Sequence, residues 1–225
     1  MKRILAAIIA AALLLSGCTS ASRPAVSAPP AETPSPSPTP IVTPTPAPEP
    51  SDDELVLVRD YIPGIFIDLK YATTDNFTGQ VIYDSDKAYL RYGTVKKLLA
   101  AQNELSGRGL SLKIWDAYRP VSAQFKLWEI CPNPVYVSDP NNGYSKHSRA
   151  NTVDITLVTD TGKSIPMPSG FDDFTSLADR DYSDVSDEAA ENARLLENVM
   201  VENGFVPYSG EWWHYSDSVA YDVYG

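Results

Sequence analysis

The sequence predicts an α+β domain in which helices pack on an antiparallel sheet. Three observations lead to this fold class. Some segments alternate apolar and polar residues with the period of two typical of strands, others have the spacing of amphipathic helices, and two short strand-like segments follow one another near the C-terminus. The 225 residues contain no visible internal repeat, and domains of roughly 100–200 residues leave room for one domain with appendages.

Five segments are expected to form strands. The first three alternate apolar and polar residues, and the hairpin signal Asp160-Thr161-Gly162 follows the third of them. The last two are short and lie on either side of Ser209-Gly210. The expected strands cover residues 64–72, 110–117, 153–157, 205–208 and 212–215.

Three helices are expected between these strands. Apolar residues at helical spacing over residues 95–105 predict the first, and Gly107 marks its end. Pro120 opens the second, which extends to about residue 130, because the first helical position needs no N–H. Ser186 caps the third, whose apolar face ends before Gly204.

The N-terminus has the pattern of a bacterial export signal. Lys2 and Arg3 precede a twelve-residue apolar run, which is too short for a membrane span of ~20 residues. The run ends at Leu15-Ser16-Gly17-Cys18, which resembles the lipobox of bacterial lipoproteins; the alternative is an ordinary secretory signal with a chance cysteine. We expect a signal peptide at residues 1–17, a lipid on Cys18 and a membrane-anchored protein that faces the extracytoplasmic side.

Residues 18–51 are expected to form an extended tether. Eleven of the nineteen prolines lie within residues 21–50, where large apolar residues are almost absent, so little surface is available for burial. The folded domain is therefore expected at residues 52–225. Loss of Lys2 and Arg3 with the signal would change the formal charge from −11 to −13.

The composition excludes several classes of protein. With 29 Asp and Glu against 18 Lys and Arg, the chain lacks the basic surface that nucleic-acid binding requires, so we expect no nucleic-acid partner. Two cysteines cannot make a disulfide scaffold, and Cys131 is expected to be a buried small hydrophobe. Two histidines exclude any site that needs three imidazoles from one chain.

The two histidines are candidate metal ligands. Either one alone would more often be a structural or surface histidine, but Asp154 lies seven residues after His147 in an otherwise apolar strand, where an unpaired carboxylate is costly. His147, Asp154 and His214 would give a divalent metal three protein ligands and leave a fourth position open, as in catalytic zinc sites.

Glu211 is a candidate general base because it precedes His214 by three residues. In a regular strand two residues at this spacing face opposite sides of the sheet. Ser209-Gly210 just ahead therefore leads us to place Glu211 in a turn. Arg119 follows a buried strand; it suits either oxyanion stabilisation or an ion pair with Asp116, and the sequence favours neither.

Five motifs in this order resemble the D-alanyl-D-alanine dipeptidases of the VanX type, a family within the zinc D-Ala-D-Ala peptidases. The resemblance implies one zinc ion per chain on His147, Asp154 and His214, with Glu211 as base and Arg119 at the transition state. It further implies that Ser145 and Asp172 bind the substrate. The motifs are YATTDNFTG (71–79), WDAYRP (115–120), SKHSRANTVDITL (145–157), PMPSGFDDF (166–174) and GEWWHY (210–215).

The chain departs from the family pattern at two positions near the expected metal site. The family usually has Gly and Ala where this sequence has Ala150 and Thr152. Because Ala does not readily adopt positive φ, we expect this loop to run in a conformation open to Ala.

The expected activity is zinc-dependent hydrolysis of the dipeptide D-Ala-D-Ala, and the Glu-Trp-Trp-His string favours this dipeptidase branch. Two alternatives remain open. One is a D,D-carboxypeptidase that trims peptidoglycan stem peptides, and the other is a non-catalytic cell-wall binding module.

Overall fold

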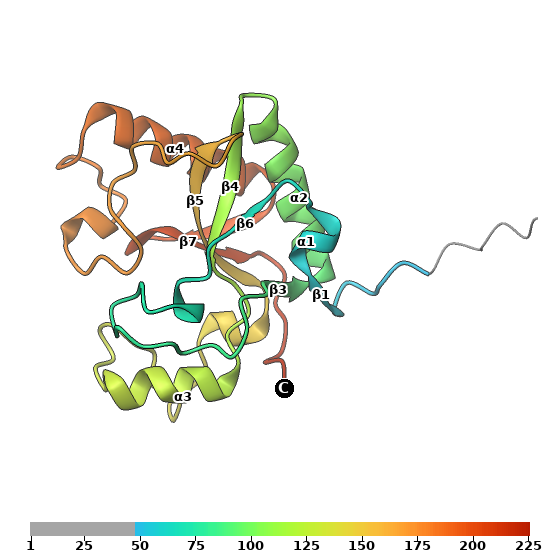
Figure 1. The fold of residues 1–225 in the computed structure, drawn as a ribbon, viewed down its shortest axis with the longest axis vertical. Coiled ribbons are helices and arrows are strands. Elements are labelled where there is room, and N and C mark those ends of the chain that lie inside the picture. Colours follow the sequence, from blue (N-terminus) through green and yellow to red (C-terminus); the bar gives the residue numbers. More distant parts are fainter. Residues whose placement is uncertain (1–47) are drawn as a thin grey trace, which may run out of the picture. The chain divides into compact units, whose positions relative to one another are not determined.

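The computed structural model describes residues 48–225 (Figure 1). The expected signal peptide, the lipidated Cys18 and nearly all of the expected tether lie outside the described residues. Within the described part, no helix has the length and apolar character needed to cross a membrane.

A five-stranded sheet forms the centre of the domain, with strand order β2-β4-β5-β7-β6. The pairs β4–β5, β5–β7 and β6–β7 are antiparallel, and β2 runs parallel to β4. The sheet is thus mostly antiparallel, as predicted, with one parallel strand at its edge. Its strands are β2 (Phe66–Ile67), β4 (Leu110–Asp116), β5 (Thr152–Thr159), β6 (Phe205–Tyr208) and β7 (Glu211–Asp217).

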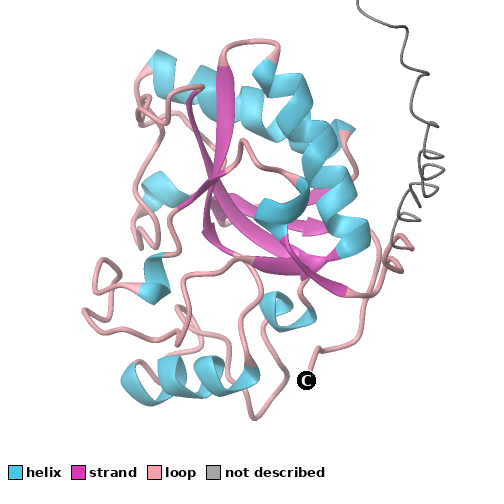
Figure 2. Ribbon diagram, turned by 45° about the vertical axis from the view of Figure 1, so that its right-hand side comes forward, coloured by secondary structure: helices cyan, strands magenta, loops and turns pink. Residues whose placement is uncertain are grey.

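Two long helices, α2 (Tyr92–Ser106) and α4 (Asp187–Glu202), contact each other and the sheet, and enclose the core with it. A separate helix, α3 (Val121–Ile130), lies away from them (Figures 1 and 2). All three helices were predicted. The fully buried side chains of the core include Leu98, Leu105, Leu112, Ile114, Ile155 and Leu157.

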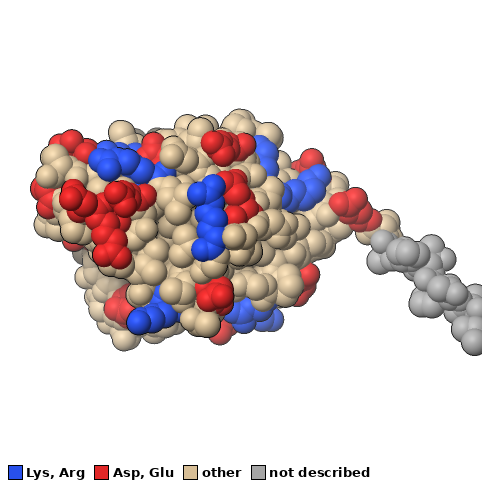
Figure 3. Space-filling view, turned by 90° about the horizontal axis from the view of Figure 1, so that it is seen from above, with Lys and Arg blue, Asp and Glu red and all other residues tan. Residues whose placement is uncertain are grey.

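Short elements complete the described part of the chain. A two-stranded sheet pairs β1 (Leu55–Leu57) with β3 (Tyr89–Arg91), and α1 (Val58–Tyr61) follows β1 directly. Three single-turn 3-10 helices are η1 (Lys70–Ala72), η2 (Lys146–Arg149) and η3 (Ser176–Ala178). On the face drawn in Figure 3, acidic and basic side chains are interspersed, and the largest acidic group lies at one end.

The predicted strand at residues 64–72 is wrong beyond β2. The chain leaves the sheet after Ile67 and turns through η1. Asn76 explains the turn, because its side-chain amide donates to the carbonyl oxygens of Lys70 at 3.2 Å and Thr73 at 2.8 Å. Side-chain amides of this kind offer the backbone an alternative to strand pairing. Tyr71 is thereby buried although it lies outside the sheet.

The loop that joins η2 to β5 also differs from expectation. Ala150 has φ 59° and ψ 26°, in the left-handed region, although we expected a conformation open to Ala. The residue is fully buried, and its backbone is held at both ends: its N–H donates to the His147 carbonyl at 3.0 Å, and its carbonyl accepts from the Arg91 N–H at 2.8 Å. This conformation costs an Ala residue about 1–2 kcal/mol, which the surrounding contacts offset.

Replacing Ala150 by Gly is therefore expected to be nearly neutral for stability. Relief of the left-handed strain offsets the loss of one buried methyl group, worth about 0.8 kcal/mol, and the greater entropy of unfolded Gly. The matched control is Ala193→Gly, which removes a buried methyl inside α4 and is expected to cost about 2 kcal/mol. Urea unfolding of both variants measures the difference, and equal losses would contradict the strain at Ala150.

Candidate metal centre and active site

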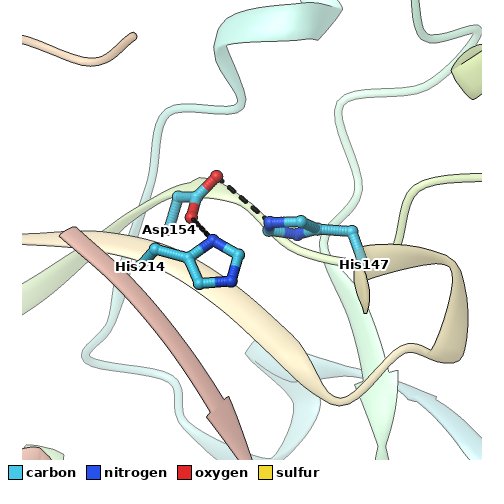
Figure 4. Close-up of side chains that lie close together, drawn as sticks. All are labelled: His147, Asp154 and His214. Atoms are coloured by element: carbon cyan, nitrogen blue, oxygen red, sulfur yellow. Dashed lines mark hydrogen bonds and ion pairs between the residues drawn. The ribbon is translucent and has the colours of Figure 1, made fainter. Parts of the chain in front are cut away.

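His147, Asp154 and His214 come together at one place in the fold. His147 lies in η2, Asp154 in β5 and His214 in β7. Asp154 and His214 are directly opposite each other in the antiparallel β5–β7 pair, and η2 brings His147 to the same carboxylate (Figure 4). One donor atom from each residue lies within 4.8 Å of the others, which is close enough for all three to bind one metal ion.

The ring of His147 is oriented by the chain behind it. Its Nδ1 lies 2.9 Å from the Ala117 carbonyl oxygen, so this nitrogen donates a proton to the backbone. Its Nε2 points toward Asp154 Oδ2 at 3.2 Å. A hydrogen bond from one ring nitrogen to a carbonyl is the usual way to fix the other nitrogen as a metal ligand.

Asp154 is buried between two imidazoles. Its Oδ1 lies 2.9 Å from His214 Nδ1, while Oδ2 faces His147. Burial alone would raise the pKa of the Asp154 carboxyl, but the charges of His147 and His214 outweigh it and hold the pKa below its usual range. Burial lowers the pKa of His147, and the negative charges of Asp154 and Asp116 reverse this to a net increase. The cluster thus keeps an ionised carboxylate at its centre.

Glu211 reaches the same cluster, but not by the route we predicted. It is the first residue of β7 rather than part of the turn. The register between β6 and β7 shifts there: Pro207 pairs with Tyr215, but Tyr208 pairs with Glu211. This irregularity removes the alternation that would separate Glu211 from His214, and Glu211 Oε2 lies 3.4 Å from His214 Nδ1. Burial, followed by the negative charge of Asp154, raises the pKa of Glu211 to about 6.

Arg119 forms the ion pair that was one of its two expected roles. Its Nη2 lies 2.7 Å from Asp116 Oδ2, and its Nη1 donates to Gln124 Oε1 at 2.9 Å. The guanidinium also lies over the Tyr71 ring at 5.1 Å. Asp116 Oδ2 is 3.6 Å from His147 Nδ1, so the pair adjoins the candidate metal ligands. These bonds fix the guanidinium and leave N–H groups for a further acceptor. The ion pair is therefore compatible with the other expected role of Arg119, which is stabilisation of an oxyanion.

The two expected substrate-binding residues, Ser145 and Asp172, lie in different parts of the site. Ser145 caps η2, since its hydroxyl oxygen accepts from the His147 N–H at 3.3 Å. Asp172 has φ 53° and accepts a 2.7 Å hydrogen bond from the Tyr71 hydroxyl, which connects it to the Arg119 side of the site. Burial raises the pKa of Asp172 to about 7, against the opposing effect of the Tyr71 hydrogen bond. The substrate-binding roles of both residues stay predictions.

A cavity of about 210 Å³ opens beside Glu211 and His214. Tyr208 and Lys146 line it together with the segment that connects α3 to η2. This segment, residues 131–145, contributes the side chains of Pro134, Val135, Tyr136 and Ser138. Cys131, at its start, was expected to be a buried small hydrophobe; it packs against the hydrophobic core but is only partly buried.

Asp116 and Tyr83 complete this site; the sequence offered Asp116 only as an ion-pair partner of Arg119 and did not single out Tyr83. Asp116 is fully buried and accepts from the Tyr83 hydroxyl at 2.5 Å and from the Ala117 N–H at 2.8 Å, in addition to Arg119. A carboxylate at the end of an apolar strand was a signal for Asp116, of the same kind that identified Asp154. Tyr83 had no such signal, because it lies in a segment without regular structure.

Comparison with known sequences places these residues in a known family. The Peptidase_M15 family, described as D-ala-D-ala dipeptidase, matches residues 51–222. A D-alanyl-D-alanine dipeptidase of Escherichia coli (strain K12) is 39% identical, over 72% of this chain and 83% of its own length. Dipeptidases of the same name from Enterococcus faecium and Streptomyces coelicolor are 35% and 36% identical, over 69% and 72% of this chain and 87% and 91% of their own lengths.

Among solved structures, VanYB in complex with D-Alanine-D-Alanine resembles this chain with a TM-score of 0.41 and 16% identity, over 69% of this chain and 86% of that one. The family assignment comes from the sequence matches, which cover the sheet and every residue of the candidate site. On that basis the chain belongs to the D-Ala-D-Ala dipeptidase family of M15 metallopeptidases.

Proposed function

We propose that this protein hydrolyses the free dipeptide D-Ala-D-Ala to two molecules of D-alanine, with one Zn²⁺ per chain held by His147, Asp154 and His214. The observation that carries the proposal is the convergence of these three donors with Glu211 beside an open cavity, in a chain of this family.

The donor set fits zinc. Two imidazoles and one carboxylate are ligands that catalytic zinc sites use, and three protein ligands leave a position free for water or substrate. The hydrogen bond from His147 Nδ1 to the Ala117 carbonyl supports the ligand from behind. When bound, the metal would supply a Lewis acid that polarises the peptide carbonyl and lowers the pKa of a water molecule, so that the water loses a proton easily and becomes a strong nucleophile.

Glu211 is placed to move the protons of this reaction. It lies at the cavity and next to a metal ligand, where it takes the proton of the attacking water and passes it to the leaving amine. A carboxylate with a pKa of about 6 is a suitable base near neutral pH. A cation among the three ligands would further favour its ionised form.

Arg119 and Asp172 are placed to bind the charged parts of the substrate. Arg119, fixed by Asp116 and Gln124, donates to the oxygen that becomes negative when water attacks the carbonyl. Asp172, fixed by the Tyr71 hydroxyl, accepts the free ammonium group of the dipeptide. The ring of Tyr71 lies between these two residues and sets their relative positions.

Glu211→Gln is expected to retain zinc but to lower kcat by about 10²–10⁴-fold, because it removes the base and keeps the shape of the side chain. Release of D-alanine and zinc content measure the two effects. The matched control is Glu202→Gln, at the exposed end of α4. Near-normal turnover in Glu211→Gln would exclude Glu211 as the base, and zinc without peptidase activity in the parent protein would favour the binding module instead.

Free D-Ala-D-Ala is expected to be hydrolysed far better than N-acetyl-D-Ala-D-Ala, because acetylation removes the ammonium group that Asp172 accepts. Asp172→Asn keeps an acceptor for the Tyr71 hydroxyl and removes the charge, so it should raise KM for the free dipeptide and reduce this preference. Steady-state kinetics with both substrates measures it. Equal hydrolysis of the two by the parent enzyme would favour a D,D-carboxypeptidase.

We also propose that the protein acts outside the cytoplasmic membrane, anchored through a lipid on Cys18 after removal of residues 1–17. The basic start, the apolar run and the sequence Leu15-Ser16-Gly17-Cys18 support this location. Cys18→Ser is expected to abolish labelling by a fatty-acid probe and to release the protein from the membrane fraction of a bacterial host. A Cys131→Ser variant is the matched control, and labelling that persists in Cys18→Ser would overturn the anchor.

A further inference from the structure

Two segments that carry candidate site residues, 131–145 and the segment that contains Asp172, meet through a pair of aromatic rings. Tyr136 belongs to the 131–145 segment that lines the cavity beside Glu211. Phe174 follows Asp172 by two residues. Their ring centroids are 4.5 Å apart with an interplanar angle of 40°. We call this pair the aromatic bar.

The aromatic bar is connected to the expected ammonium site by further rings. Phe174 meets Phe77 edge to face at 5.3 Å, and Phe77 meets Tyr71 in the same way at 6.4 Å. Tyr71 in turn donates its hydroxyl hydrogen to Asp172. The bar therefore holds a fixed position relative to the carboxylate that receives the N-terminal end of the dipeptide.

The aromatic bar contributes little to the core of the protein. Tyr136 and Phe174 are each 47% exposed, and neither packs in the main hydrophobic cluster. Because Tyr136 lines the cavity and Phe174 packs on Tyr136, this half-exposed pair lies at the edge of the cavity rather than in the core.

We propose that the aromatic bar sets the length of the substrate, by closing the space that a residue preceding the dipeptide would occupy. The inference rests on the proposed function, because Asp172 must bind the ammonium group for the bar to lie on the N-terminal side. With its ammonium group on Asp172 a dipeptide would end there, and a residue added before it would enter the space that Phe174 and Tyr136 border. The bar thus separates a dipeptidase from an enzyme that trims longer chains.

The test compares kcat/KM for D-Ala-D-Ala with that for Gly-D-Ala-D-Ala, the smallest extended substrate, in the zinc-loaded protein. Tyr136→Ala and Phe174→Ala are each expected to raise the ratio of tripeptide to dipeptide hydrolysis by at least about tenfold. The matched control is Tyr144→Ala. Tyr144 lies in the same 131–145 segment and is equally exposed at 47%, but among the described residues it has no aromatic partner and does not line the cavity. Its ratio should stay unchanged.

Hydrolysis of the dipeptide tests the proposed function, and the ratio of tripeptide to dipeptide hydrolysis tests the role of the aromatic bar. Absence of dipeptide hydrolysis in the parent protein contradicts the proposed function. If Tyr136→Ala and Phe174→Ala hydrolyse the dipeptide with an unchanged ratio, only the proposal about the aromatic bar is overturned. The same holds if the parent protein hydrolyses the tripeptide as well as the dipeptide. If a variant loses dipeptide turnover, calorimetric binding of the tripeptide is measured in the Glu211→Gln background with and without Tyr136→Ala. Binding that does not strengthen then overturns the bar.

Discussion

The structure of the site depends on one buried carboxylate. Asp154 lies in the middle strand of the sheet, and its two oxygens face two imidazoles that reach it from different directions. A carboxylate in this position is stable only with positive partners, so it requires both histidines to remain where they are. The pairing of β5 with β7 supplies one partner and the turn of η2 supplies the other. The strand pairing that builds the sheet thus also positions the side chains of the site.

A second buried carboxylate makes the arrangement rigid. Asp116 is the register partner of Asp154 on the neighbouring strand β4. It binds the Arg119 guanidinium, the Tyr83 hydroxyl and the Ala117 N–H, and its Oδ2 lies 3.6 Å from His147 Nδ1. Asp154 therefore lies between the two histidines, and Asp116 orients the arginine beside them. Asp154 pairs with the two histidines and Asp116 pairs with Arg119. Because both carboxylates are buried, both interactions are stronger than they would be in water.

The sequence predicted most of the architecture because the long elements have strong periodic signals. The helices α2, α3 and α4 and the strands β4, β5, β6 and β7 lie where the patterns placed them, within the usual uncertainty at their ends. The convergence of His147, Asp154 and His214 was predictable for a related reason, since Asp154 conflicted with its apolar strand and only two histidines were available. The parallel pairing of β2 with β4 was not predictable, because the sequence pattern of a two-residue strand does not indicate the direction in which it pairs. The left-handed Ala150 and the register shift before Tyr215 were hidden for another reason: tertiary contacts impose both against local preference.

The spacing of the three candidate ligands along the chain has a consequence for how the protein would acquire a metal. His147 and Asp154 are seven residues apart, whereas the hydrogen-bonded Asp154 and His214 are separated by 60. A refolding chain therefore has a local two-donor site first and completes it only when the long loop closes and β7 joins the sheet. Metal present during refolding captures the closed form and shifts the equilibrium toward it. A bound ion would then hold this long-range pairing closed as well as supply the chemistry of the site.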